Sequence, residues 1–175
     1  MLTLVVGGAA SGKSAYAEAL VLRSAAARRI YLATMSAGGE EARRRIEKHR
    51  AMRGAGKGFE TVECPVDVSS VTLPPDSAVL LEDMGNLCAN ELFSPESSGQ
   101  EAAESILRGV ARLKEQCRDL VIVSNEVFTG GADYLDDTEK YLSLLSYVNR
   151  RLAETADAVC EVSCGIPMYY KGEEA

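Results

Sequence analysis

The sequence is poor in the residues that build zinc sites and disulfide frameworks. It contains a single histidine, His49, and its five cysteines include no Cys-x-x-Cys pair. Because structural zinc sites need four Cys or His ligands at short spacings, this composition does not indicate one. We expect reduced thiols that are buried as small hydrophobic side chains. The cysteines are Cys64, Cys88, Cys117, Cys160 and Cys164.

The sequence also lacks a long hydrophobic run and an excess of positive charge. The opening apolar run, residues 1–6, is too short for a signal-peptide core or a membrane span. A net charge of −7 argues against a general nucleic-acid binder and against binding to an anionic membrane. We therefore expect a cytoplasmic protein with a small-molecule partner. With 46% hydrophobic residues, the 175-residue chain is long enough for one domain, 1–175, with its own core.

Short apolar runs alternate with segments of helical periodicity along the chain. Runs that are apolar on both faces are typical of parallel strands, and the segments between them are long enough for helical crossovers. The pattern predicts a doubly wound α/β fold with a mostly parallel sheet. The expected strands are 3–6, 30–34, 78–82, 120–124 and 158–162, and the expected helices are 13–27, 39–52, 99–117 and 138–155.

The stretch GGAASGKS, residues 7–14, matches the phosphate-binding loop Gly-x-x-x-x-Gly-Lys-Ser between an expected strand and an expected helix. Backbone N–H groups of such a loop cradle phosphate oxygens, its lysine contacts the β- and γ-phosphates, and its serine binds Mg²⁺. The alternative is a glycine-rich turn without a ligand. The predicted nucleotide-binding residues are Gly7, Gly8, Ala9, Ala10, Ser11, Gly12, Lys13 and Ser14.

A pair of carboxylates, Glu82 and Asp83, ends the apolar run 78–82. Ligands of open α/β sheets bind at the carboxyl ends of the strands, so a carboxylate there can hold the metal of a nucleotide. We expect Glu82 to be the metal ligand with Ser14. The alternative is an acidic turn at a strand end.

The single histidine lies in a basic segment. Residues 40–57 carry seven basic and three acidic side chains, in a chain whose net charge is −7. Such a segment can face a polyphosphate, and the neutral imidazole of His49 could attack an α-phosphorus. A solvated basic helix is the alternative.

Together with GGAASGKS, four further segments make the sequence recognisable. These are RIEKHR at 45–50, LLED at 80–83, VSNEV at 123–127 and VNRRLAETADAV at 148–159. In this order they resemble the bifunctional adenosylcobinamide kinase / adenosylcobinamide-phosphate guanylyltransferase family, over nearly the whole chain.

The resemblance implies a RecA-like P-loop NTPase fold, a homotrimer and two reactions. The hydroxyl of adenosylcobinamide first takes the γ-phosphoryl group of ATP or GTP, a step in which Lys13 is catalytic. GTP then guanylylates a histidine, and the substrate phosphate displaces GMP to give adenosylcobinamide-GDP. The family's histidine maps to His49. The family's Asn-Glu pair maps to Asn125 and Glu126, which would line the site unless they form a plain loop cap.

Two departures from the family pattern keep other functions open. Ala10 stands where the family's phosphate loop commonly has arginine, and the residues after Val127 differ from the family's usual Gly-rich and Arg-rich segments. A kinase without efficient guanylyl transfer, or a RecA-like regulatory module that binds nucleotide without transfer, are the competing hypotheses.

Overall fold

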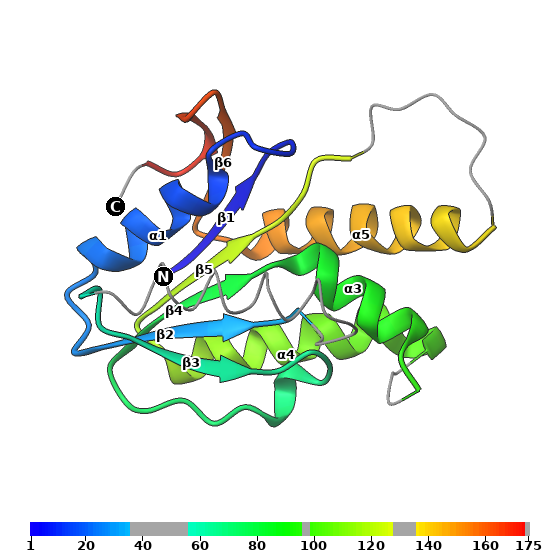
Figure 1. Cartoon of the computed structure of the whole chain (residues 1–175), viewed down its shortest axis with the longest axis horizontal. Coiled ribbons are helices and arrows are strands. Elements are labelled where there is room, and N and C mark those ends of the chain that lie inside the picture. Colours follow the sequence, from blue (N-terminus) through cyan, green and yellow to red (C-terminus); the bar gives the residue numbers. More distant parts are fainter. Residues whose placement is uncertain (36–55, 96–98, 128–135, 174–175) are drawn as a thin grey trace.

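The computed structural model describes residues 1–35, 56–95, 99–127 and 136–173, which form a seven-stranded sheet with helices on both faces (Figure 1). The strands are β1 (Leu2–Val6), β2 (Arg28–Ala33), β3 (Phe59–Glu63), β4 (Ser77–Glu82), β5 (Asp119–Val123), β6 (Ala158–Ser163) and β7 (Ile166–Lys171). The helices are α1 (Lys13–Arg23), α3 (Met84–Phe93), α4 (Ala102–Gln116) and α5 (Asp136–Thr155), with 3₁₀ turns at Val68–Ser70 and Gly99–Glu101.

The strand order is β3-β2-β4-β5-β1-β6-β7, and only the β6–β7 pair is antiparallel. Parallel pairing brings the carboxyl ends of β1, β2, β4 and β5 to one edge of the sheet. The phosphate loop follows β1 and the acidic pair follows β4, so both lie at that edge. The α/β class with a mostly parallel sheet is confirmed, and the fold is the RecA-like P-loop NTPase fold that the resemblance implied.

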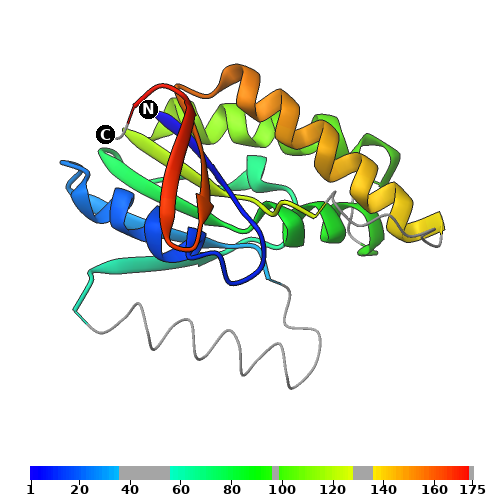
Figure 2. The ribbon, with the colours of Figure 1, turned by 90° about the horizontal axis from the view of Figure 1, so that it is seen from above.

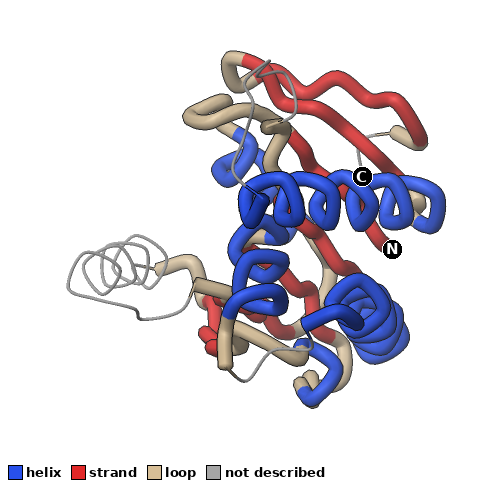
Figure 3. Tube along the Cα trace, turned by 90° about the vertical axis from the view of Figure 1, so that its right-hand side faces the viewer, coloured by secondary structure: helices blue, strands red, loops and turns tan. Residues whose placement is uncertain are grey.

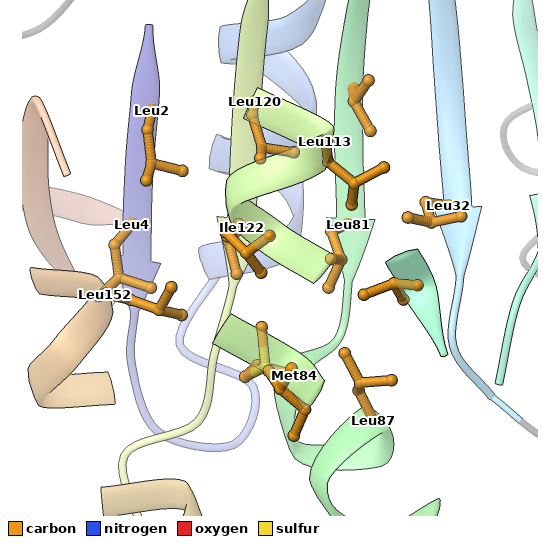
Figure 4. Packing of buried hydrophobic residues seen from close by; sticks show 14 of the residues in the cluster. Leu2, Leu4, Leu32, Leu81, Met84, Leu87, Leu113, Leu120, Ile122 and Leu152 are labelled. Carbon is orange, nitrogen blue, oxygen red and sulfur yellow. The ribbon is translucent and has the colours of Figure 1, made fainter. Parts of the chain in front are cut away.

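Alternating side chains of each strand supply two separate cores. Leu2, Leu4 and Ile122 face α3, α4 and α5, and Figure 4 shows how closely these side chains pack with Leu113 and Leu152. The intervening strand residues, such as Val5 and Val121, face α1 on the other side of the sheet. Figure 2 shows α4 and α5 on one side of the strands and α1 on the other. This burial on both faces explains why the strands read as continuous apolar runs.

The five expected strands are confirmed to within two residues at each end. The expected helix 13–27 is wrong at its end, because the extended backbone of Ser24 terminates α1 and its hydroxyl accepts a hydrogen bond from Ala26 N at 3.1 Å. The helix expected at 39–52 lies outside the described residues. The helices expected at 99–117 and 138–155 are confirmed with shifted starts.

Three elements have no counterpart in the sequence prediction: β3, α3 and β7. Strand β3 lies at the sheet edge with every side chain at least partly exposed, so it lacks an apolar run. Helix α3 begins one residue after β4, with Asp83 between them as its N-cap.

The cysteines are all free thiols. Cys64, Cys88 and Cys160 are buried, as expected, whereas Cys117 is half-buried. Cys164 is exposed, which corrects the expectation of burial, because it occupies the turn between β6 and β7. No helix in the described part of the chain is both long and apolar enough to span a membrane.

Candidate active site

The phosphate loop runs from the end of β1 to the first residue of α1. Gly12 precedes the helix with a φ of +93°, and a Cβ there would lie 3.0 Å from Gly165 Cα, so the position requires glycine. Ala9, Ala10 and Gly12 are exposed, which leaves the loop open to a ligand. Ala10 itself adopts a left-handed conformation, with a φ of 55°, the kind of backbone strain that concentrates at ligand-binding loops.

Lys13 is the first residue of α1, and its side chain folds back over the loop. Only 8% of the residue is exposed, and Nζ donates a hydrogen bond to Gly8 O at 3.0 Å. The hydroxyl of Ser11 is buried without a hydrogen-bond partner in this structure. Ser14 follows in the first helical turn and is half-buried. The helix N-terminus and the ammonium group therefore present positive charge toward the loop.

Two segments distant in sequence hold the loop in place. Gly165 N, in the turn between β6 and β7, donates to Ser11 O at 2.8 Å. Glu126 N, just beyond β5, donates to Gly7 O at 3.0 Å. The predicted site residue Glu126 therefore lies directly against the start of the phosphate loop. Sequence reasoning missed the contact from Gly165, although a Cys-Gly dipeptide between two strands is a turn signal.

The two carboxylates after β4 have different environments. Glu82 is the last strand residue and is 8% exposed. Asp83 caps α3, and its Oδ1 accepts a hydrogen bond from Asn86 N at 2.7 Å. Burial raises the pKa of Asp83, and the charge of Glu82 adds to this, whereas the Asn86 hydrogen bond and the charge of Lys13 oppose it. Lys13, Glu82 and Asp83 thus share one electrostatic neighbourhood.

A polar cluster surrounds the backbone of Gly85 in the first turn of α3. A Cβ at Gly85 would lie 2.8 Å from Asn125 Nδ2, 2.9 Å from the Tyr141 hydroxyl and 3.2 Å from Asp83 Oδ1. Asn125 follows β5 and Tyr141 comes from α5, so three elements converge at this point. Burial raises the pKa of Tyr141 to about 12, with a further contribution from the charge of Asp83, which keeps its hydroxyl protonated near neutral pH. The sequence analysis did not identify Tyr141, because the pattern of a helical segment does not show that one of its tyrosines lies against Gly85.

The end of β2 is tied to the same edge. Thr34 N donates to Glu82 O at 3.2 Å, and its hydroxyl donates to Asp83 O at 2.7 Å. Asn90 Nδ2 of α3 donates to Thr34 O at 2.8 Å. Thr34, which follows β2 and precedes the basic segment in sequence, therefore lies against the backbone of Glu82 and Asp83.

His49 lies outside the described residues, as do six of the seven basic side chains counted in residues 40–57. The seventh, Lys57, forms an ion pair with Glu18 of α1, with Nζ 2.6 Å from Oε1. Its charge is therefore partly neutralised by the protein itself.

The structure brings most of the predicted site residues together at one edge of the sheet. The loop from Gly7 to Ser14, Glu82, Asn125 and Glu126 all lie at the carboxyl ends of β1, β4 and β5. Figure 3 views the molecule with α3 and α5 in front of the strands. The described residues contain no group of three or more His, Cys, Asp or Glu side chains suited to a metal.

The chain is similar over its whole length to known enzymes. A family model described as "Cobinamide kinase / cobinamide phosphate guanyltransferase" matches residues 3–170. The bifunctional adenosylcobalamin biosynthesis protein CobU of Salmonella typhimurium is 32% identical over 185 residues, which cover 98% of this chain and 100% of the relative. The corresponding protein CobP of Pseudomonas aeruginosa is 32% identical over 178 residues, 99% of each chain.

Two solved structures share the fold at low identity. The flagellar accessory protein FlaH from Methanocaldococcus jannaschii matches 98% of this chain and 78% of its own, with a TM-score of 0.51 and 10% identity. The protein PH0250 from Pyrococcus horikoshii matches 98% of this chain and 86% of its own, with a TM-score of 0.54 and 8% identity. Identities this low show a common fold and nothing of function.

Proposed function

The chain belongs to the cobinamide kinase / cobinamide phosphate guanyltransferase family, and we propose that it catalyses both reactions that the family name describes. The acceptor is adenosylcobinamide, and ATP or GTP is the phosphoryl donor. GTP then supplies GMP to the phosphorylated acceptor, which yields adenosylcobinamide-GDP. The observation that carries this proposal is the open phosphate loop with the buried Lys13 beside two carboxylates, in a chain that matches the family from residue 3 to 170.

In the kinase step, the backbone N–H groups of the loop bind the β- and γ-phosphates, and Lys13 neutralises charge that develops on the transferred group. The acceptor hydroxyl attacks the γ-phosphorus, the bond to the bridging oxygen breaks, and the nucleoside diphosphate leaves. Lys13 exchanges its present hydrogen bond with Gly8 O for contacts with phosphate oxygens, which compensates the cost of breaking that bond.

The donor set at this edge fits Mg²⁺. Ser14 offers a hydroxyl in the first turn of α1, and Glu82 offers a carboxylate at the end of β4. Oxygen ligands of this kind, few in number and completed by substrate phosphates, are what Mg²⁺ takes in nucleotide sites. The bound ion would neutralise charge on the phosphate oxygens. Asn125 and Glu126 line the same site beside the loop.

In the guanylyl step, we assign the nucleophile to His49. A ring nitrogen of the neutral imidazole attacks the α-phosphorus of GTP, a P–N bond forms, and pyrophosphate leaves. The phosphate of the acceptor then attacks the same phosphorus, and the P–N bond breaks to regenerate the imidazole. This assignment rests on the RIEKHR segment and on the family membership.

Three further features belong to the same proposal. Residues 1–175 act as one domain, since β1 and β7 from the two ends of the chain belong to one sheet. The active form is a homotrimer, which light scattering at several concentrations would test. The cytoplasmic location and the expectation of neither nucleic-acid nor membrane partners stay predictions.

The decisive experiment incubates the purified protein with adenosylcobinamide, Mg²⁺ and GTP and follows the mass of the corrinoid. Addition of a phosphate group followed by addition of GMP supports both activities. Phosphate addition alone identifies a kinase without guanylyl transfer, the alternative that the missing Arg-rich segment after Val127 keeps open. An unchanged corrinoid contradicts both enzyme hypotheses, and the regulatory module that binds nucleotide without transfer is then the remaining one. Replacing GTP by ATP in a parallel reaction identifies the phosphoryl donor.

A further inference from the structure

A shallow cavity that is open to solvent lies between α3 and α5, and the nucleotide chemistry described above gives it no role. Its volume is about 250 Å³, and Ala89 and Phe93 of α3 and Asp137, Thr138 and Tyr141 of α5 line it. Sites that enclose an entire drug-sized ligand measure roughly 300–1,000 Å³. The cavity is therefore suited to a small part of a larger molecule. In Figure 1, α3 and the first turns of α5 both lie beyond the arrowheads of β4 and β5, the edge at which the phosphate loop also lies.

Tyr141 connects this cavity to the nucleotide site. Its side chain lines the cavity, and its hydroxyl lies with Asn125 Nδ2 and Asp83 Oδ1 around Gly85. Asp83 in turn interacts electrostatically with Lys13, and Glu126, next to Asn125, donates to the phosphate loop at Gly7 O. Consecutive contacts thus lead from the cavity through Tyr141 to the residues that would hold the γ-phosphate.

The lining also favours one kind of ligand. The methyl group of Ala89 and the rings of Phe93 and Tyr141 offer apolar surface, and Thr138 and Tyr141 offer hydroxyl groups. Among the lining residues that the structure describes, Asp137 alone is charged, and Lys140 on the same helix forms an ion pair with it, with Nζ 3.1 Å from Oδ1. The described part of the lining offers no cationic side chain to a polyphosphate, whereas an uncharged alkyl chain with a hydroxyl group would meet complementary surface. Phe93 is 51% exposed, so apolar surface continues outward from the cavity.

We propose that the cavity between α3 and α5 binds the hydroxyl-bearing side chain of the acceptor alcohol, and that Tyr141 directs this hydroxyl toward the γ-phosphate. This inference rests on the proposed kinase function and extends it by naming the acceptor subsite. The bulk of the corrinoid stays outside the cavity, next to Phe93.

The test measures the steady-state kinetics of the kinase reaction, with adenosylcobinamide and triphosphate varied separately. Ala89→Leu fills the cavity, and we expect its KM for adenosylcobinamide to rise about tenfold or more while its KM for triphosphate stays at the wild-type value. Tyr141→Phe keeps the ring but removes the hydroxyl, and we expect a loss of about two- to tenfold in kcat/KM for the acceptor. Ser143→Leu and Tyr147→Phe are the matched controls, because both residues are exposed on α5 and line no part of the cavity.

The possible outcomes separate this inference from the proposed function. If the wild-type protein phosphorylates adenosylcobinamide but both cavity variants match it, the subsite is overturned and the kinase stands. An equal rise of both KM values in Ala89→Leu also overturns the subsite, because the change then reaches the nucleotide. If Ala89→Leu does not fold, Tyr141→Phe decides the test. Wild-type acceptor kinetics in Tyr141→Phe then reject the acceptor subsite. A wild-type protein without kinase activity removes the proposed function and this inference together.

Discussion

Replacing Gly85 by alanine tests the geometry on which the site depends. A Cβ at this position would lie 2.8 Å from Asn125 Nδ2 and 2.9 Å from the Tyr141 hydroxyl, whereas ordinary contact begins at 3.4 Å. The two side chains, or α3 itself, must therefore shift by about 0.5 Å. Asn125 is a predicted site residue and Tyr141 lies beside it, so the substitution disturbs the site without removing any of its functional groups.

The expected effects on stability and activity differ in size. Crowding of a packed site costs about 1–3 kcal/mol, and alanine recovers up to about 1 kcal/mol through its higher helix propensity. A net loss of about 1 kcal/mol lowers Tm by roughly 2–4 °C in a domain of this size. Misplacement of substrate-positioning groups by a fraction of an ångström to 1 Å costs up to ~10²-fold in rate. We therefore expect kcat/KM for adenosylcobinamide to fall by about tenfold or more while the protein stays folded.

The assay combines urea unfolding with kinase kinetics, and Gly109→Ala is the control. A Cβ at Gly109 of α4 would lie 2.5 Å from Val68 Cγ2, a comparable clash that involves none of the site residues. We expect Gly109→Ala to lose stability and to keep the wild-type kcat/KM below its unfolding transition. Wild-type kinetics in Gly85→Ala, or an equal loss of activity in both variants, would refute the reasoning.

The remaining predictions concern individual side chains. Lys13→Ala lowers the kinase kcat by about 10²–10³-fold, since it removes a charge aimed at the transferred group, and circular dichroism shows an unchanged fold. Glu82→Gln raises the Mg²⁺ concentration needed for half-maximal rate, whereas Asp83→Asn has a smaller effect because asparagine also caps a helix; the reverse ranking would move the metal role to Asp83. With GTP labelled at the α-phosphate, the wild-type protein takes up a label that is acid-labile and base-stable. His49→Ala lacks this label but keeps its kinase activity. A fully labelled His49→Ala protein contradicts the assignment of the nucleophile. Asp157 accepts a hydrogen bond from Leu2 N at 2.6 Å, which lowers the pKa of its carboxyl group. Its contribution to stability is therefore present above the unfolded-state pKa of about 4 and lost as pH falls below it, so thermal unfolding of Asp157→Ala should differ from wild type at pH 7 and converge with it in acid.

Sequence patterns predicted the buried central strands, and they failed at exposed edge strands and at a helix that continues the apolar run of a strand. The central strands are apolar on both faces and were therefore evident in the sequence. Strand β7 contains Ile166, Met168 and Tyr170, but all three are exposed at the sheet edge, so their alternation does not mark a core strand. Helix α3 follows β4 so closely that its apolar residues Met84, Leu87 and Cys88 extend the apolar run of the strand.

The sequence by itself determined the phosphate loop, the acidic strand end and the α/β class, because each depends on local spacing: a glycine-rich turn between a strand and a helix, or a carboxylate at the end of an apolar run. It also identified the family, through motifs spread along the chain. Only the tertiary structure decided that Gly165 supports Ser11, that Glu126 contacts Gly7, and that Tyr141 reaches Gly85. These contacts join residues 56 to 154 positions apart, and no local pattern encodes them, because they arise when parallel strand order brings remote carboxyl ends to the same edge of the sheet.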